Sequence, residues 1–297
     1  MTAALFTFAD GARQAAGLAS ECGVPVNQID VHRFPDGESL VRIDGSAETA
    51  LLFRSLDDPN AKLVEVLLAA SALRDGGAKR VILIAPYLAY MRQDVPFHDG
   101  EAVSQRVIGK LLAAWFDGLV TVDPHLHRIA SLNAIMGGIP ALAVSAAPAL
   151  MQAIASDLDP RTIMVGPDSE SRPWVESIAH PLGLDVLVGE KIRKGDREVV
   201  LTVPDFARAS GRPAILVDDL ISSGTTVMAC ARLLHEAGAT RVEAIATHSL
   251  ASVADLDRLT VAGIARLRAT DSTSNAIASI PLAGVLGEAI RKQGWLK

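Results

Sequence analysis

A single segment, residues 214–227, constrains the fold of this chain more than any other. It begins with an apolar run at 214–217, which suits a strand buried on both faces of a parallel sheet. After a short polar turn, apolar residues recur at helical spacing, at Val227, Ala231 and Leu234. A strand that passes through a tight turn directly into a helix is typical of parallel sheets covered by helices. The segment therefore predicts an α/β fold.

The turn of this segment is rich in hydroxyl groups and contains one glycine, and two adjacent carboxylates precede it. The first N–H groups of a helix lack intrahelical partners and lie at the positive end of the helix dipole, so such a turn can bind a phosphate without lysine. The carboxylates can accept hydrogen bonds from sugar hydroxyls, and a hydroxylated or metal-bound ligand would explain why two like charges stand together. An ordinary N-cap is the alternative. The candidate residues for a sugar phosphate are Asp218, Asp219, Ser222, Ser223, Gly224, Thr225 and Thr226.

Strand-like apolar runs alternate with helix-like segments along the rest of the chain, which favours mainly parallel sheets flanked by helices. The expected strands are 51–53, 80–85, 119–122, 162–165, 186–188, 214–217 and 242–247. The expected helices are 61–74, 103–116, 173–182 and 225–237.

An internal repeat and the length indicate two domains. A chain of 297 residues is long enough for about two cores. Gly77-Ala-Lys-Arg-Val81 is matched by Gly238-Ala-Thr-Arg-Val242, each between a predicted helix and a predicted strand. The same pattern also suits any helix stop followed by a strand start. The Ala- and Pro-rich stretch 140–148 is a plausible crossing between halves, so we expect domains at 1–145 and 146–297.

Composition excludes several classes of protein. Hydrophobic residues make up 49% of the chain, yet no uninterrupted apolar run reaches the roughly 18 residues that a membrane span needs. The net charge is −6 and no Lys/Arg cluster occurs, which argues against a nucleic-acid surface. Two cysteines are too few for a disulfide framework, and the first residues lack the basic and apolar regions of a secretory signal. We expect a cytoplasmic protein that binds small ligands, not membranes or nucleic acids.

Further short segments narrow the interpretation of residues 214–227. They are Arg33-Phe-Pro-Asp-Gly-Glu38, Tyr90-Met-Arg-Gln-Asp94, Val122-Asp-Pro-His125, Gly166-Pro-Asp168 and Glu190-Lys-Ile-Arg193. Residues 217–226 alone resemble the phosphoribosyl diphosphate loop of type I phosphoribosyltransferases. With the other segments, in this order, the chain resembles the ribose-phosphate pyrophosphokinases from Phe34 to the C-terminal helix. The resemblance implies two similar phosphoribosyltransferase-like domains.

The resemblance also implies a reaction and an ATP site. The family transfers the β,γ-diphosphoryl group of ATP to the 1-hydroxyl of ribose 5-phosphate, releases AMP and uses Mg2+ bound to the ATP. Phenylalanine can stack on adenine, carboxylates can accept from its amine and from ribose, and the guanidinium fork suits phosphate. An Asp-Gly turn beside a core Phe34, and a surface salt bridge of Arg92, are the alternatives. The matching residues are Phe34, Asp36, Glu38, Arg92, Gln93 and Asp94.

Charged residues elsewhere match the family's catalytic and metal-binding positions. Lys191 and Arg193 correspond to its catalytic lysine and arginine, whose fixed charges would stabilise the transferring group, although a solvated charge run looks the same. His125 follows a predicted strand at the end where α/β sheets bind ligands, and in the family it contacts magnesium-bound ATP. Asp168 matches an aspartate that helps hold magnesium, which prefers oxygen ligands. A zinc site at His125 and His127 lacks further ligands at suitable spacing.

Some positions depart from the family pattern. The family usually has small residues after Asp168, whereas this chain has Ser169-Glu170-Ser171-Arg172. Thr225 replaces a glycine, and a β-branched residue tolerates positive φ poorly. Ser222 replaces an aspartate that is common in bacterial members. A phosphoribosyltransferase that consumes phosphoribosyl diphosphate, and a non-catalytic partner of an active synthetase, are therefore kept as alternatives.

The resemblance implies an oligomer as well. In the family the ATP site lies across a two-fold dimer interface, and the segment from Phe34 to Glu38 comes from the neighbouring chain. We therefore expect a homodimer or a higher homo-oligomer.

Overall fold

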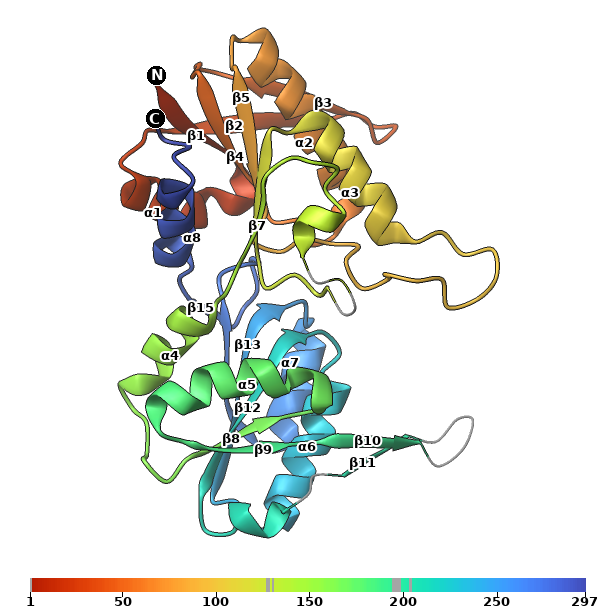
Figure 1. Ribbon diagram of the computed structural model, residues 1–297, viewed down its shortest axis with the longest axis vertical. Coiled ribbons are helices and arrows are strands. Elements are labelled where there is room, and N and C mark those ends of the chain that lie inside the picture. The colour runs from red at the N-terminus through yellow and green to blue at the C-terminus, as the bar shows by residue number, and fades with distance from the viewer. Residues whose placement is uncertain (1, 127–128, 130, 194–198, 203–204) are drawn as a thin grey trace. The chain divides into compact units, whose positions relative to one another are not determined.

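The computed structural model describes the whole chain except residues 1, 127–128, 130, 194–198 and 203–204, with residues 191–193 and 199–202 described by their backbone alone. The chain divides into two compact units, Met1–Ser145 with Pro281–Lys297, and Ala146–Ile280 (Figure 1). This division differs from the expected domains in its last segment, because Pro281–Lys297 belongs to the first unit, where the C-terminal helix packs against the first helix.

The first unit is built on a seven-stranded sheet in the order β3-β2-β1-β4-β5-β6-β7. Every neighbouring pair is parallel except β2 and β3, which form a hairpin. Helices α1 and α8 lie on one side of the sheet, and α2 and α3 on the other (Figure 1). The strands are β1 (Ala3–Phe8), β2 (Val26–Arg33), β3 (Ser39–Ile43), β4 (Thr49–Phe53), β5 (Arg80–Ile84), β6 (Gly118–Val122) and β7 (Ala141–Val144), and the helices are α1 (Ala12–Cys22), α2 (Pro59–Asp75), α3 (Ser104–Trp115) and α8 (Ala283–Lys292).

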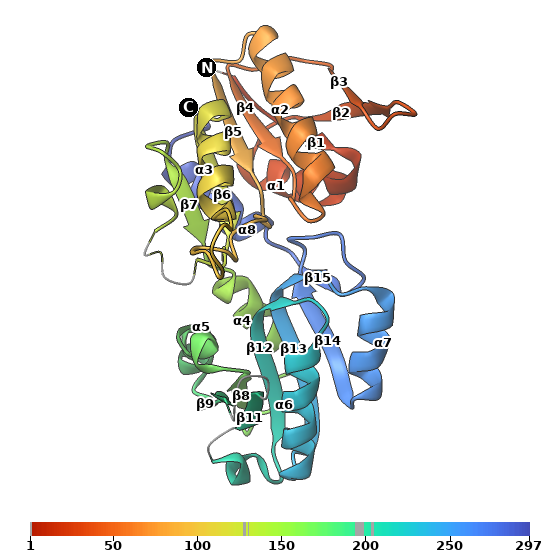
Figure 2. The ribbon, with the colours of Figure 1, turned by 90° about the vertical axis from the view of Figure 1, so that its right-hand side faces the viewer.

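The second unit has a six-stranded, wholly parallel sheet in the order β15-β14-β13-β12-β8-β9, flanked by helices (Figure 2). A separate antiparallel ribbon pairs β10 with β11. The strands are β8 (Ile163–Gly166), β9 (Asp185–Val188), β10 (Glu190–Arg193), β11 (Val199–Thr202), β12 (Pro213–Ile221), β13 (Arg241–Ser249), β14 (Ile264–Thr270) and β15 (Ala278–Ile280), and the helices are α4 (Ala147–Ala155), α5 (Arg172–Ala179), α6 (Thr225–Glu236) and α7 (Val253–Val261). Short 3-10 turns are η1 (Ala9–Gly11), η2 (Leu132–Ala134), η3 (Ser169–Ser171), η4 (His180–Leu182) and η5 (Phe206–Ala209).

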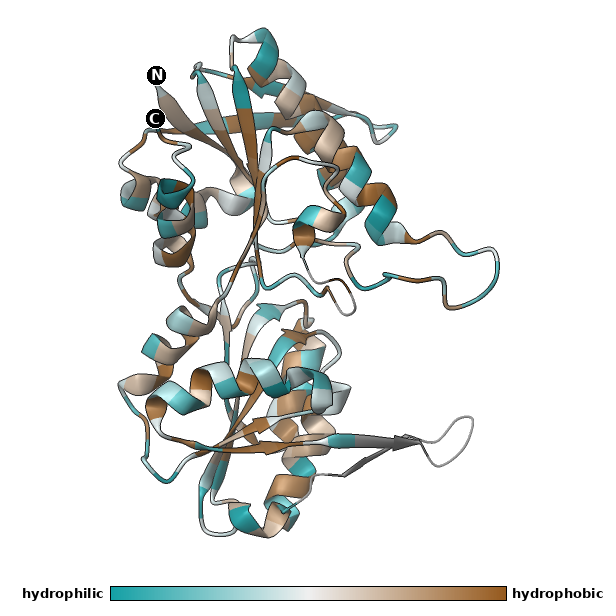
Figure 3. Ribbon diagram, in the orientation of Figure 1, coloured by the Kyte–Doolittle hydropathy of each residue, from teal (hydrophilic) through white to brown (hydrophobic). Residues whose placement is uncertain are grey.

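Each unit has its own hydrophobic core, because its central strands are covered on both faces. In the first unit β4 and β6 are buried at every residue. In the second, the apolar start of β12 packs with Val227, Ala231 and Leu234, the residues whose spacing predicted α6. Figure 3 shows the hydrophobic colour concentrated on the central strands and on the sides of the helices that face them. Among the described residues, none of the helices has the length and apolar character that a membrane crossing requires.

The internal repeat marks equivalent turns in the two units. Gly77, with φ 97°, follows α2 and leads to β5, and Gly238, with φ 86°, follows α6 and leads to β13. In both places the next residue donates its N–H to a helix carbonyl five residues back, over 3.0 and 2.9 Å. Both glycines therefore end a helix in the left-handed region, as the sequence pattern predicted.

The α/β class with two mainly parallel sheets is confirmed, and every predicted strand and helix occurs within a few residues of its expected bounds. One difference, at the end of β12, affects the candidate site. The predicted strand at 214–217 extends to Ile221 in the structure, so Asp218 and Asp219, which were expected between the strand and the turn, lie within β12. Several elements escaped prediction, among them β2, in which only Ile29 is buried and the apolar pattern is correspondingly weak.

Candidate active site

The carboxyl half of β12 holds two aspartates at the edge of the second sheet where its strands end. Asp218 pairs in register with Ala246 of β13, and the pairing continues to Ile221. The N–H of Asp219 donates to Oδ1 of Asp218 over 3.0 Å, and both side chains are half-buried. The strand therefore fixes the two carboxylates next to each other at a position that ligands can reach.

The electrostatics of this edge disfavour three negative charges. Burial raises the pKa of Asp218 well above its ordinary value, and the nearby carboxylates of Asp219 and Asp168 raise it further. Asp168 follows β8, the strand beside β12, so three carboxylates from two adjacent strands act on one another. In the part of the chain that the structure describes, no group of three or more His, Cys, Asp or Glu residues is arranged to hold a metal ion. A cation here would therefore need oxygens from a ligand or water.

The segment after Asp168 is a capped helix start. Oδ1 of Asp168 accepts from the N–H of Ser171 over 3.3 Å, and the Ser171 hydroxyl donates to the Asp168 carbonyl over 2.5 Å. A Cβ on Gly166 would collide with the Ser171 hydroxyl, so the serine takes space that this glycine leaves open. Glu170 is exposed in the first turn, where the helix dipole favours an acidic residue. These contacts give the non-glycine sequence at 169–171 a local structural reason.

The turn between β12 and α6 depends on Gly224. Its φ of 72° lies in the left-handed region, and a Cβ there would come within 2.8–3.0 Å of the Leu259 side chain from α7. The hydroxyls of Ser223 and Thr225 lie 3.1 Å apart on the exposed side, and Ser222 and Thr226 are half-buried beside them. The turn thus presents hydroxyls and the free N–H groups of a helix start to one place, as a phosphate requires.

The expectation that Thr225 is strained is wrong. Thr225 is the first residue of α6, and among the described residues outside glycine the positive φ values belong to Asp58, Tyr90, Asp123 and Asp205. Threonine is therefore compatible with the backbone at this position, and the family's second glycine is not needed for the turn.

Replacing Thr225 by glycine is accordingly expected to weaken the protein without improving phosphate binding. Glycine in the first turn adds freedom to the unfolded chain and removes the hydroxyl beside Ser223, at a cost of roughly 0.5 kcal/mol. Urea denaturation measures the loss of stability, and calorimetric titration with ribose 5-phosphate measures binding. A tighter affinity in Thr225→Gly would show that the threonine obstructs the turn after all.

In the first unit, residues 34–38 form the tip of the β2–β3 hairpin, which extends away from the sheet in Figures 1 and 2. The N–H of Phe34 donates to the Glu38 carbonyl over 2.8 Å, and the N–H of Glu38 donates to Oδ1 of Asp36 over 3.2 Å. The Phe34 side chain is 40% exposed and makes an edge contact with the His32 ring at 4.7 Å. Phe34 is thus not a core residue, and it is available to stack on a flat ligand.

The segment around Arg92 and Gln93 is fixed by the start of α3. Oε1 of Gln93 accepts from the N–H of Ser104 over 3.5 Å, and its Nε2 donates to Glu101 over 3.1 Å. Arg92 is exposed, whereas Asp94 is buried. The structure therefore presents Arg92 to solvent and orients Gln93 by hydrogen bonds.

His125 lies just beyond the carboxyl end of β6, where it is half-buried. The backbone before it is held by Asp123, whose N–H donates to the Val144 carbonyl over 2.9 Å and whose φ is 38°. His127 lies outside the described residues. Lys191 and Arg193 lie on β10, opposite Leu201 and Val199 of β11, and their side chains are outside the described part of the chain.

In the second unit the predicted residues gather at one place. Asp168, Asp218, Asp219 and the turn at 222–226 meet at one edge of the second unit. The first unit carries 34–38, 92–94 and His125.

Comparisons with known proteins cover almost the whole chain. Residues 3–115 match the model of the N-terminal domain of ribose phosphate pyrophosphokinase, and residues 139–261 match the phosphoribosyl transferase domain. A ribose-phosphate pyrophosphokinase of Methanopyrus kandleri is 34% identical over 95% of this chain and 96% of its own length. One from Methanobrevibacter smithii is 30% identical over 93% and 96%. The crystal structure of a phosphoribosylpyrophosphate synthetase from Mycobacterium smegmatis covers 99% of both chains with a TM-score of 0.85 and 27% identity.

Proposed function

The chain belongs to the ribose-phosphate pyrophosphokinase family, and we propose that it transfers the β,γ-diphosphoryl group of ATP to the 1-hydroxyl of ribose 5-phosphate, giving phosphoribosyl diphosphate and AMP. The observation that carries this proposal is the β12–α6 segment, in which two carboxylates precede a hydroxyl-rich turn and a helix start that can accept a phosphate. A pentose phosphate needs this combination of hydroxyl acceptors and N–H donors in one place.

The second unit would bind ribose 5-phosphate. Its 5-phosphate would accept hydrogen bonds from the hydroxyls and N–H groups of residues 222–226, and Asp218 and Asp219 would accept from the ribose hydroxyls. Gly224 takes the left-handed conformation in this turn, and that conformation would set the arrangement of these donors.

The first unit would bind ATP. Exposed Phe34 would stack on adenine, and Asp36 and Glu38 at the same hairpin tip would accept from its amine and from ribose. Exposed Arg92, half-buried Gln93 and His125, and buried Asp94 would bind the nucleotide and its phosphates. Because the hairpin tip lies away from its own sheet, we propose that the protein forms a homodimer or larger homo-oligomer in which this tip completes the ATP site of a neighbouring chain.

Magnesium fits the carboxylate edge of the second unit. Repulsion among Asp168, Asp218 and Asp219 would be relieved by a divalent cation, and carboxylate oxygens suit Mg2+. When bound with ATP, Mg2+ neutralises phosphate charge and orients the phosphates. Asp168 would contact it at this edge of the second unit, and in the first unit His125 would contact the magnesium-bound ATP. Lys191 and Arg193 would stabilise the negative charge of the transferring diphosphoryl group. A cytoplasmic location remains a prediction.

Two other functions can be tested in the same experiments. A phosphoribosyltransferase would use the β12–α6 segment but not the hairpin tip, and the match of residues 3–115 to the pyrophosphokinase N-terminal domain favours the synthetase. A regulatory partner without activity is suggested only by Glu170 in the segment that the family usually fills with small residues.

Purified protein with Mg2+, ATP and ribose 5-phosphate is expected to form AMP and phosphoribosyl diphosphate in equal amounts. Lys191→Ala is expected to lower kcat on the order of 100-fold or more, because a fixed charge at the transferring group is lost. The matched control is Lys79→Ala, which removes an exposed lysine paired with Glu48 and is expected to leave the rate within about twofold.

Background ATP hydrolysis alone, unchanged in Lys191→Ala, would contradict the proposal. Release of pyrophosphate from phosphoribosyl diphosphate that depends on an added base would favour a phosphoribosyltransferase. Absence of turnover together with co-purification of an active synthetase would favour a regulatory partner.

A further inference from the structure

Glu65 is a fully buried carboxylate on α2, in a helix face that otherwise buries apolar residues. Its side chain has no exposed surface, and charged groups are rarely buried without a partner. Neither the sequence patterns nor the proposed reaction accounts for it. The residues that form hydrogen bonds and ion pairs with Glu65 indicate its role.

One oxygen of Glu65 binds both strands of the β2–β3 hairpin. Oε1 accepts from Nε of Arg33 over 3.2 Å, and Nη2 of Arg33 lies 3.1 Å from the same oxygen. The hydroxyl of Ser39 donates to it over 2.9 Å. Arg33 is the last residue of β2 and Ser39 is the first residue of β3. The carboxylate therefore joins the two residues that flank the tip at 34–38.

The other oxygen of Glu65 forms an ion pair with Arg54, which directly follows β4. Nη1 of Arg54 lies 2.5 Å from Oε2 of Glu65, and the Arg54 residue is only 5% exposed. The guanidinium carbon is 3.8 Å from the centre of the Phe8 ring, and Nε is 3.5 Å from Asp10. Arg54 thus packs against the end of β1, and it connects Glu65 to the central sheet of the unit.

The charge state of Glu65 agrees with this arrangement. Burial raises the pKa of Glu65, but the close ion pair with Arg54, the hydrogen bond from Ser39 and the charge of Arg33 outweigh it, so its pKa is lowered. The carboxylate is therefore ionised at neutral pH and can hold both arginines.

We propose that Glu65, anchored by Arg54, is a positioning residue for the nucleotide: it holds Arg33 and Ser39 so that the hairpin tip presents Phe34, Asp36 and Glu38 to adenine in one fixed geometry. The inference rests on the proposed adenine-binding role of the tip. Glu65 touches no substrate, so its loss acts on the affinity for ATP through the hairpin rather than on the transfer step.

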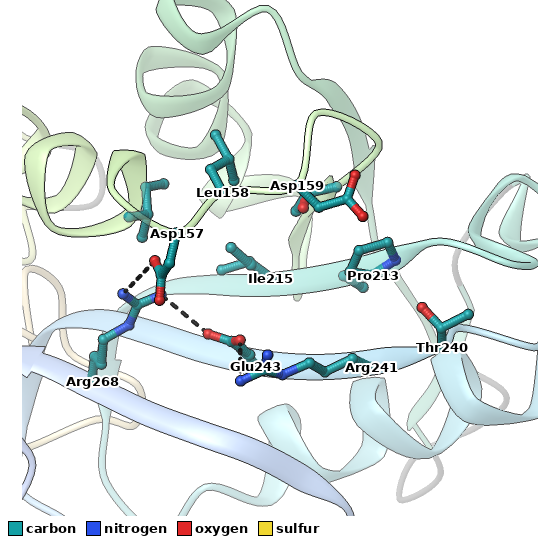
Figure 4. Close-up of a pocket in the computed structure, with 12 residues that line it drawn as sticks. Asp157, Leu158, Asp159, Pro213, Ile215, Thr240, Arg241, Glu243 and Arg268 are labelled. Atoms are coloured by element: carbon teal, nitrogen blue, oxygen red, sulfur yellow. Dashed lines mark hydrogen bonds and ion pairs between the residues drawn. The ribbon is translucent and has the colours of Figure 1, made fainter.

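A largely buried glutamate that is also held by two arginines provides a matched control. Glu243 of β13 lies 3.1 Å from Arg268 and 2.8 Å from Arg241, and its side chain is 12% exposed. This cluster lines a cavity of about 210 Å3 at the starts of β12 and β13 (Figure 4). Asp218 lies in the other half of β12. Both glutamates are held by two arginines, but only Glu65 is connected to the hairpin.

The experiment compares Glu65→Gln with Glu243→Gln in steady-state kinetics and in hydrogen exchange of the intact protein. Glu65→Gln is expected to raise KM for ATP about tenfold, leave kcat and KM for ribose 5-phosphate within about twofold, and speed amide exchange at residues 34–38. Glu243→Gln is expected to lower the melting temperature without any of these changes. If Glu65→Gln does not fold, Ser39→Ala and Arg33→Lys alter only the hairpin side of the cluster and are expected to raise KM for ATP in the same direction.

The inference is overturned if Glu65→Gln and Ser39→Ala change stability alone, with KM for ATP and exchange at 34–38 like those of Glu243→Gln. Phe34→Ala separates this failure from that of the proposed function. If Phe34→Ala raises KM for ATP and Glu65→Gln does not, only the positioning role fails. If Phe34→Ala leaves KM for ATP unchanged, the adenine role of the tip is itself wrong.

Discussion

Replacing Asp218 by asparagine is expected to make the ligand-free protein more stable and much less active. The change removes a charge that burial, Asp219 and Asp168 all disfavour, so we expect a gain of about 0.5–2 kcal/mol in the free energy of unfolding. It also removes a carboxylate that would accept from ribose hydroxyls and attract magnesium. We expect kcat/KM for ribose 5-phosphate to fall on the order of 100-fold, as when one preorganised polar contact is lost from an active site.

The sign of the pH dependence follows from the raised pKa of Asp218. Between the unfolded and the folded pKa, the folded protein binds more protons than the unfolded chain, so stability falls as pH rises through the folded pKa. The stability advantage of Asp218→Asn should therefore be small near pH 4 and largest at neutral pH. Thermal melts of both proteins from about pH 4 to about pH 8, without divalent cations, measure this stability difference.

Asp185 provides the control with the opposite sign. Hydrogen bonding and charge from Arg212, with a further contribution from Arg208, lower the pKa of this aspartate at the start of β9. Asp185→Asn is therefore expected to lose stability at neutral pH and to lose less as the pH falls through the folded pKa. Equal losses of stability in Asp218→Asn and Asp185→Asn would contradict the inference that the charge of Asp218 destabilises the ligand-free folded protein.

The local pattern predicted the fold well because parallel strands buried on both faces leave continuous apolar runs, as 214–217 and 119–122 do. Polar continuations of a strand leave no such signal. The extension of β12 through Asp218 to Ile221 is set by pairing with β13, which no local pattern contains. The hairpin strand β2 was missed for the same reason, since its partners stabilise a sequence that is largely exposed.

The candidate site shows the same division between local and long-range information. Residue types and order predicted site roles for Asp218, Gly224 and Phe34, because each stands in a short motif. Glu65 was not found, since its role depends on contacts with Arg33 and Arg54, which are distant in sequence from it and from each other. A lone glutamate among the apolar residues of the predicted helix at 61–74 was the only available signal. The expected strain at Thr225 was wrong because the left-handed residue of this turn is Gly224, and Thr225 already begins α6.

Replacing Gly224 by alanine is expected to disable the ribose 5-phosphate site. An alanine at φ 72° costs about 1–2 kcal/mol, and its Cβ would meet Leu259 at 2.8 Å, so the turn must move. A displacement of this kind at preorganised donors is expected to raise KM for ribose 5-phosphate on the order of 10- to 100-fold. KM for ATP is expected to change little, because the proposed nucleotide residues 34–38 and 92–94 lie in the other unit.

Two further variants distinguish the two effects of Gly224→Ala, which are the strain of a left-handed alanine and the collision of its Cβ with Leu259. Gly183 has φ 67° and nothing within 4 Å of its Cβ position, so Gly183→Ala should show the stability cost of strain without any change in KM. Adding Leu259→Ala to Gly224→Ala removes the colliding atoms but leaves the strain. If the collision displaces the turn, the double variant regains part of its affinity for ribose 5-phosphate even though Leu259→Ala alone lowers stability by leaving a cavity in the core. An affinity that stays low in the double variant would mean that the left-handed backbone at Gly224 alone sets the phosphate-binding geometry, and an unchanged affinity in Gly224→Ala would remove this turn from the site.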